Sequence, residues 1–131
     1  MSLKYVLIAE DEPDISDLLQ QAIAERLYVA THVVANGALV HDAIAARRPD
    51  LLILDLGLPG LSGNDVVDLM RNDPAYAGLP VLILTGSPDK APSTAGQRVI
   101  GKPFDLDAVL DAVDAMVDGG VPAAASPFAS T

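Results

Sequence analysis

The stretch from Leu51 to Gly63, LLILDLGLPGLSG, constrains the fold of this chain more than any other. Four apolar residues run without a polar break into Asp55, and a turn rich in glycine and proline follows. This pattern is typical of a strand that is buried on both faces, as in a parallel sheet covered by helices. Asp55 is therefore expected at the carboxyl end of that strand, where ligands gather in open α/β sheets. A single aspartate at such a position more often only caps the following turn.

The rest of the chain alternates between short apolar runs and segments with helical spacing. Further strands are expected at residues 5–9, 28–35, 81–85 and 98–101, and helices at 13–26, 39–44, 64–71 and 106–117. Such alternation predicts one three-layer parallel α/β domain with right-handed connections. The domain is expected to span residues 1–118, and residues 119–131, which show no periodicity, are expected to form a mobile tail.

Composition narrows the classes of partner. The net charge is −10, which argues against nucleic acid as a partner, because DNA and RNA binding depends on lysine and arginine. Because the chain contains no cysteine, it has no disulfide, thiolate metal site or cysteine nucleophile. No apolar run has the length of a signal peptide core or a membrane span, so we expect a soluble cytoplasmic protein without membrane contact.

Polar residues follow four of the expected strands. They are the acidic cluster that begins at Glu10 and Asp11, then Asp55, Thr85 and Lys102. Each has an ordinary explanation when taken alone: a solvated turn at a helix start, a turn cap, the last residue of a strand, or a surface cation. The carboxyl ends of parallel strands share one edge of the sheet, so together these residues predict a site.

The residue types at this edge predict phosphoryl chemistry. Crowded carboxylates repel one another, and Mg²⁺, which binds oxygen ligands and retains waters, would relieve that repulsion. An ionised Asp55 can attack phosphorus and form an aspartyl phosphate. The hydroxyl of Thr85, the ammonium of Lys102 and backbone amides near Asp55 and Gly86 would balance the charge of the phosphoryl oxygens. Gly86, which lacks a side chain, is expected to leave room for the phosphoryl group.

Four motifs, LIAEDE, LLILDLGLPGLSG, VLILTG and GKPF, occur in this order at the expected strand ends. Over residues 3–118 the chain thereby resembles the receiver domains of bacterial two-component response regulators. The resemblance implies a (βα)5 flavodoxin-like fold with strand order 2-1-3-4-5. It also implies a regulator that accepts a phosphoryl group from a sensor histidine kinase or a phosphotransfer protein and signals to a downstream protein target, with a homodimer as a further option. Because few residues follow the last expected helix, we expect a single-domain regulator. Such a protein is not an enzyme beyond catalysing its own phosphorylation and dephosphorylation.

The resemblance also implies a role for each site residue. Asp55 would be the phosphoacceptor, with Thr85 and Lys102 acting on the phosphoryl group. The backbones of Leu56 and Gly86 would contact that group as well. The implied protein contribution to Mg²⁺ binding consists of Asp11, Asp55, the carbonyl of Gly57, and Glu10 through a water molecule. The Lys102–Pro103 peptide bond is expected to be cis, which would direct the lysine inward.

The chain departs from this family in two places. Val99 occupies the position, three residues before the lysine, where receivers commonly carry an aromatic switch residue. The segment between the fourth and fifth strands is short and rich in proline, so the fourth helix is expected to be shortened or absent. Both departures predict an altered output surface more than altered phosphorylation chemistry.

Two other functions remain open at this point. A binding module that keeps the fold but works without phosphorylation would be consistent with the altered output surface. A phosphatase of the haloacid-dehalogenase type also combines an aspartate nucleophile with threonine, lysine and Mg²⁺. That family has a second acid two residues after its nucleophile, and this chain has Gly57 there.

Overall fold

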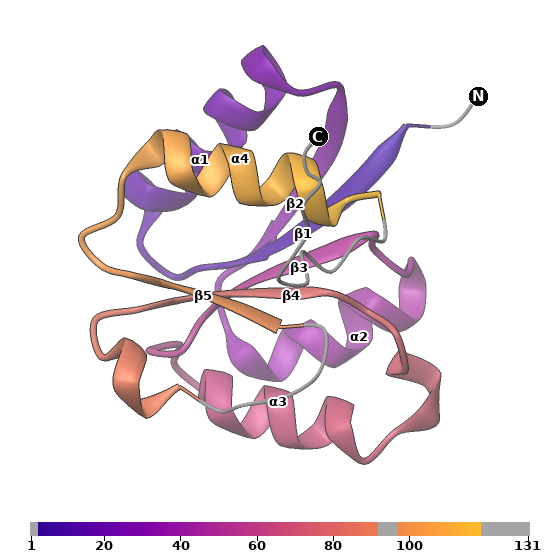
Figure 1. Cartoon of the computed structure of the whole chain (residues 1–131). Helices are drawn as coiled ribbons and strands as arrows, with labels where there is room; N and C mark the ends of the chain where they lie inside the picture. The colour runs from indigo at the N-terminus through magenta and orange to yellow at the C-terminus, as the bar shows by residue number, and fades with distance from the viewer. Residues whose placement is uncertain (1–2, 92–96, 119–131) are drawn as a thin grey trace.

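The computed structural model describes residues 3–91 and 97–118, and within them five strands form one parallel sheet (Figure 1). The strand order is β2-β1-β3-β4-β5, as predicted. The strands are β1 (Lys4–Ala9), β2 (Val29–Val34), β3 (Leu51–Asp55), β4 (Val81–Thr85) and β5 (Gln97–Gly101). Neighbouring strands all pair in parallel, so the carboxyl ends of the five strands lie at the same edge of the sheet.

Helices cover both faces of the sheet, which confirms the three-layer flavodoxin-like fold. The helices α1 (Pro13–Arg26) and α4 (Leu106–Met116) cover one face, and α2 (Val40–Ala46) and α3 (Gly63–Arg71) cover the other (Figure 1). Single 3-10 turns precede α2 and follow α3 and β4, at η1 (Gly37–Leu39), η2 (Pro74–Tyr76) and η3 (Pro88–Lys90). The predicted element ends agree with these bounds to within two residues.

The central strand β3 explains how the sequence specifies this architecture. Its residues Leu51 to Leu54 are all fully buried. Because side chains alternate along a strand, Leu52 and Leu54 enter the core beneath α2 and α3, whereas Leu51 and Ile53 enter the core beneath α1 and α4. The continuous apolar run is therefore needed to supply two cores at once, and Asp55 is the first polar residue at the edge where both cores end.

The connection between β4 and β5 differs from the other strand connections of this chain, each of which contains an α-helix. Among the described residues it contains only the single turn η3, which agrees with the predicted shortening or loss of a helix there. Residues 92–96 and the predicted mobile tail, residues 119–131, lie outside the described residues. Val99, at the position expected to carry the aromatic switch, is partly buried and packs against the α2–α3 core. Within the described part of the chain, none of the helices is both long enough and apolar enough to cross a bilayer.

A capping box at the start of α3 ends the loop that follows Asp55. The Ser62 hydroxyl accepts a hydrogen bond from the Asp65 amide at 3.2 Å, and the Asp65 carboxylate accepts one from the Ser62 amide at 3.3 Å. Ser62→Ala removes half of this reciprocal cap, so we expect it to lower the free energy of unfolding by about 1 kcal/mol. Ser62→Thr, which keeps a hydroxyl, should lose much less. Urea denaturation measures both, and an unchanged Ser62→Ala midpoint would contradict the role of this cap.

Candidate functional site

The carboxyl edge of the sheet gathers the polar residues that were predicted to form a site. Glu10 follows β1, Asp55 and Thr85 end β3 and β4, and Lys102 follows β5. Because β1, β3, β4 and β5 are consecutive neighbours in the sheet, these residues lie along one continuous edge. Glu10 is 1% exposed, Asp55 6% and Thr85 7%, so three polar side chains are buried at this edge of the sheet.

Three carboxylates converge at this edge. Glu10, Asp11 and Asp55 each offer an oxygen, and these oxygens all lie within 4.8 Å of one another. Asp11 is exposed, so the cluster has one side open to water. Hard oxygen donors with an open side suit Mg²⁺, which binds few protein carboxylates and keeps several of its waters. The donor set therefore fits the ion that the sequence predicts.

Lys102 bridges two of these acids. Its Nζ lies 3.3 Å from Oδ1 of Asp55 and 3.4 Å from Oε1 of Glu10. The Lys102 amide donates a hydrogen bond to the Thr85 carbonyl at 2.7 Å, which fixes the end of β5 beside the end of β4. The Lys102–Pro103 peptide bond is cis, as predicted. The lysine is thus placed to neutralise negative charge that is buried at the ends of β1 and β3.

Burial changes the acidity of this cluster. Burial, together with the neighbouring Asp55 carboxylate, raises the pKa of Glu10 to about 7. The Glu12 amide, which donates to Oε2 of Glu10 at 3.1 Å, and the Lys102 ammonium act in the opposite direction. For Lys102, partial burial by itself lowers the pKa, but the Asp55 and Glu10 carboxylates outweigh burial and leave its pKa above the usual value. The lysine therefore stays charged wherever the acids around it are ionised.

Thr85 and the turn after Asp55 supply further polar groups. The Thr85 hydroxyl accepts a hydrogen bond from the Ser87 amide at 3.0 Å, which leaves its own hydrogen for another acceptor. The Leu56 amide, predicted to contact a phosphoryl group, donates instead to the Leu84 carbonyl at 3.3 Å. The amide that lies on the Asp55 carboxylate belongs to Gly57, which donates to Oδ1 at 3.1 Å. The Gly57 amide, and not the Leu56 amide, therefore contacts the carboxylate that is predicted to react.

Gly86 is exposed directly after Thr85. A Cβ built at this position would meet no heavy atom of the described residues within 4 Å. The protein itself therefore leaves enough space here for an alanine, and the lack of a side chain at Gly86 is not required by packing. Its backbone remains accessible to a ligand at the sheet edge.

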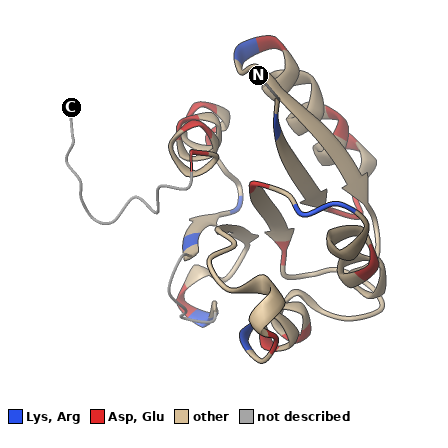
Figure 2. Ribbon diagram, turned by 90° about the vertical axis from the view of Figure 1, so that its right-hand side faces the viewer, with Lys and Arg blue, Asp and Glu red and all other residues tan. Residues whose placement is uncertain are grey.

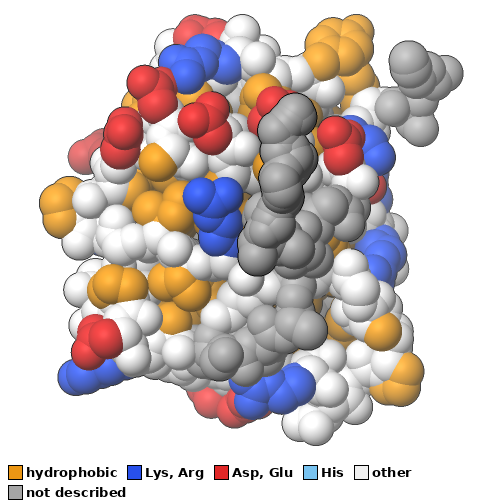
Figure 3. All heavy atoms as spheres, in the orientation of Figure 1, with side chains coloured by type: hydrophobic (Ala, Val, Ile, Leu, Met, Phe, Trp, Pro, Cys, Tyr) orange, Lys and Arg blue, Asp and Glu red, His pale blue; other side chains and the backbone are white. Residues whose placement is uncertain are grey.

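Charge elsewhere on the molecule is spread out. Figure 2 shows acidic residues on helices of both layers as well as at the strand ends. On the face shown in Figure 3, apolar side chains lie in several small groups among charged and polar ones. The charge of −10 is thus distributed over the surface, whereas the convergence of buried acids is a local feature of the carboxyl edge.

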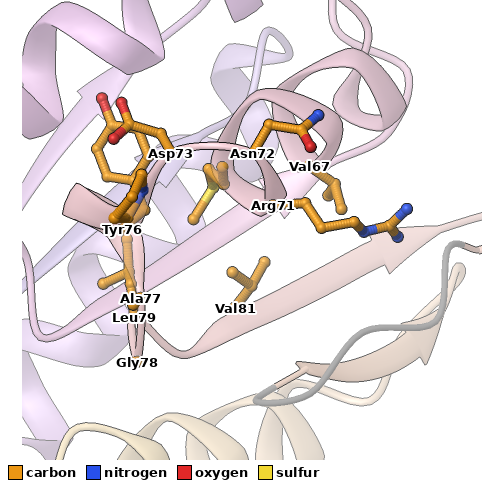
Figure 4. A pocket seen from close by; sticks show the side chains of 11 residues that line it. Val67, Arg71, Asn72, Asp73, Tyr76, Ala77, Gly78, Leu79 and Val81 are labelled. Carbon is orange, nitrogen blue, oxygen red and sulfur yellow. The ribbon is translucent and has the colours of Figure 1, made fainter.

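A hollow of about 350 Å³ lies at the opposite edge of the sheet, between the end of α3, η2 and the start of β4 (Figure 4). Its apolar walls include Val67, Met70, Leu79 and Val81. The acids, the threonine and the lysine described above take no part in its lining. The hollow is therefore separate from the carboxyl edge.

Comparison with known proteins identifies the family to which the chain is similar. The family model described as "Response regulator receiver domain" matches residues 6–114. The transcriptional regulatory protein KdpE of Mycobacterium tuberculosis is 38% identical over 121 residues, which cover 88% of this chain and 51% of KdpE. The sensor histidine kinase TmoS of Ectopseudomonas mendocina is 33% identical over 104 residues, which cover 76% of this chain and 10% of TmoS. The chain thus spans about half or less of these curated relatives.

A solved structure shares the fold. The receiver domain of sensor histidine kinase PA1611 from Pseudomonas aeruginosa PAO1 superposes with a TM-score of 0.76 over 89% of this chain and 99% of that domain, at 19% sequence identity. That domain was solved with a magnesium ion coordinated in its active site cleft. At this identity the likeness establishes the arrangement of strands and helices, and the roles of individual residues rest on the geometry of this chain.

Proposed function

The chain belongs to the family of response regulator receiver domains, and from this premise we propose that Asp55 accepts a phosphoryl group from a phosphohistidine of a sensor histidine kinase or a phosphotransfer protein. One observation carries the proposal. A buried Asp55 carboxylate lies within 4.8 Å of two other carboxylates and 3.3 Å from the Lys102 ammonium. Such a constellation stabilises the fold poorly, because buried acids repel one another, but it suits a nucleophile whose product carries additional negative charge.

The residues present fit a bound Mg²⁺. Asp11, Asp55 and the Gly57 carbonyl would hold it directly, and the buried Glu10 would hold one of its waters. When bound, the ion supplies positive charge that neutralises the oxygens of the transferred phosphoryl group. The magnesium reported in the PA1611 receiver domain supports this assignment.

The chain's own groups account for the transfer. An oxygen of Asp55 forms a bond to phosphorus while the bond from phosphorus to the donor's imidazole nitrogen breaks, and that nitrogen keeps the electron pair. Lys102, which now bridges Asp55 and Glu10, turns its ammonium to a phosphoryl oxygen. The Thr85 hydroxyl donates to a second oxygen, and the amides of Gly57 and Gly86 complete the contacts. Gly57 replaces Leu56 in this role because the Leu56 amide is engaged by Leu84.

Phosphorylation by a small phosphodonor tests the proposal. The purified chain, incubated with acetyl phosphate and Mg²⁺, should gain the mass of one phosphoryl group, and chelation of the metal should prevent the gain. The adduct should be lost in alkali, as expected for an acyl phosphate. If neither acetyl phosphate nor any histidine kinase phosphorylates the chain, Asp55 is not a phosphoacceptor.

We further propose that phosphorylation changes how the chain binds a downstream protein or a second copy of itself. Val99 in place of an aromatic residue and the single turn η3 favour an output surface unlike the usual one. These two features also favour a second function, in which partner binding is independent of phosphorylation. Partner affinity that is the same for phosphorylated and unphosphorylated chains would identify the second function, and a difference would identify the first.

Asp11 provides a test of the metal site alone. Asp11→Asn removes a charged ligand from the exposed side of the cluster, so we expect Mg²⁺ affinity, measured by calorimetry, to fall by at least about tenfold, since even changes around ligands cost that much. Glu12→Gln, a neighbouring exposed acid outside the cluster, serves as the matched control and should bind Mg²⁺ like the wild type. Equal losses in both variants would mean that general negative charge, and not this cluster, attracts the ion.

A further inference from the structure

The loop between Asp55 and α3, residues 56–62, carries the Gly57 peptide that faces the reacting carboxylate. We call it the acceptor loop. Its start is fixed, because Gly63 donates to the Leu56 carbonyl at 3.2 Å and the Leu58 side chain is 6% exposed in the α2–α3 core. Its outer part is different, since Gly57, Pro59 and Gly60 are exposed. Exposed backbone keeps one orientation only where other groups hold it.

The turn between β2 and α2 supplies those groups. The Gly37 amide donates to the Pro59 carbonyl at 2.9 Å. Gly37 also approaches the loop so closely that a Cβ at this position would lie 1.6 Å from the Leu61 carbonyl oxygen. This contact therefore requires glycine, and any side chain would push the acceptor loop away from the turn.

Asn36 makes the matching contact with Gly60. Gly60 has a φ of +77°, and a Cβ built there would lie 2.1 Å from Oδ1 of Asn36. The same Oδ1 accepts a hydrogen bond from the Ala38 amide at 2.8 Å, which fixes the asparagine side chain at the start of η1. Two successive residues of the turn thus hold three successive residues of the loop, Pro59, Gly60 and Leu61.

We propose that Asn36 and Gly37 are positioning residues that hold the acceptor loop so that the Gly57 peptide stays on the Asp55 carboxylate. The inference rests on the proposed function, because it assigns the Gly57 carbonyl to the metal and the Gly57 amide to the phosphoryl group. Gly57 lies two residues before Pro59, and the Leu58 side chain between them is held in the core, so a displacement at Pro59 or Gly60 turns the backbone about Leu58 and thereby reorients the Gly57 peptide. The turn thereby connects the β2–α2 segment to a site that it does not touch.

Two glycines with the same backbone conformation make a matched test. Gly60 and Gly78 both have positive φ, +77° and +81°, so alanine at either position is strained. Only Gly60 faces Asn36; around Gly78 no described heavy atom lies within 4 Å of a built Cβ. Calorimetry with Mg²⁺ alone should show affinity reduced about tenfold in Gly60→Ala, the smaller end of what changes around metal ligands cost, and unchanged in Gly78→Ala. Asn36→Ala in the Gly60→Ala background, which removes the clashing side chain, should recover part of the lost affinity.

A second readout needs no metal. Hydrogen exchange of the Gly57 amide, followed by NMR in metal-free protein, should be faster in Gly60→Ala and in Asn36→Ala than in the wild type, and unchanged in Gly78→Ala. Equal Mg²⁺ affinity and equal Gly57 exchange in Gly60→Ala and Gly78→Ala would overturn the positioning role. If the wild type itself bound no Mg²⁺, the metal assignment would fail, and the exchange comparison would still decide whether the turn holds the loop.

Discussion

Asp55→Asn is expected to abolish incorporation of a phosphoryl group from acetyl phosphate in the presence of Mg²⁺. The amide oxygen of asparagine is a much weaker nucleophile than a carboxylate, and the substitution removes one of the three charged groups around the metal. Intact-protein mass spectrometry should show complete loss of the adduct. The exposed acid Asp111 on α4 gives the control, because Asp111→Asn changes the net charge equally and should be phosphorylated like the wild type.

The loss of the adduct in Asp55→Asn should result from the missing nucleophile and not from unfolding of the variant. Asparagine has nearly the volume of aspartate, and its amide oxygen can still accept the hydrogen bond that the Gly57 amide donates to Asp55. Relief of repulsion with Glu10 should even offset part of the lost attraction to Lys102. Circular dichroism and urea denaturation should therefore find a folded variant. An adduct that persisted in Asp55→Asn at wild-type yield would show that another residue is the acceptor.

Lys102→Met is expected to have the largest effect on stability. Its ammonium lies 3.3 and 3.4 Å from the Asp55 and Glu10 carboxylates, both of which are buried, and its own side chain is only 20% exposed. Removing this cation leaves these acids uncompensated, which costs about 3 kcal/mol of unfolding free energy at low Mg²⁺. Urea denaturation at neutral pH with a chelator present measures this loss.

Two further measurements separate this ionic effect from lost packing. Mg²⁺ should restore part of the stability of Lys102→Met, because a bound cation compensates the same carboxylates. The double variant Lys102→Met, Asp55→Asn should be more stable than Lys102→Met alone, because one of the unpaired charges is gone. Lys90→Met, at an exposed lysine of η3, should be close to the wild type. A Lys102→Met protein as stable as the wild type in chelator would mean that the lysine does not neutralise the cluster.

The sheet and the position of the site were predictable from local patterns. The apolar runs of β1, β3 and β4 have the length and continuity of buried parallel strands, so the sequence alone places their carboxyl ends on one edge. Asp55 ends one such run, and it predicts a site only together with the polar residues at the neighbouring strand ends, Glu10, Thr85 and Lys102. The order of the strands came from the resemblance to receiver domains and is confirmed by the pairing of β2 with β1 and of β1 with β3.

Contacts between segments that are distant in sequence were not predictable in the same way. The amide of Leu56 was expected to face the phosphoryl group, yet pairing of β3 with β4 engages it with Leu84, and this depends on strand register. The dipeptide Asn36-Gly37 is by itself typical only of a turn. Its close approach to Gly60 depends on how two loops pack, and no periodicity encodes that distance. Likewise, the sequence showed an acid at Glu10 but not its nearly complete burial, which raises its pKa.

The central claim is that acids from the ends of β1 and β3 share one cation and face the hydroxyl of Thr85 and the ammonium of Lys102. A crystal structure of the chain grown with Mg²⁺ and beryllofluoride, a tetrahedral mimic of a phosphoryl group, tests this most directly. We expect the mimic on Asp55, in contact with Thr85 and Lys102, and one Mg²⁺ bound by Asp11, Asp55 and the Gly57 carbonyl. A crystal that contained the ion or the mimic elsewhere, with Asp55 still paired only to Lys102, would contradict the assignment.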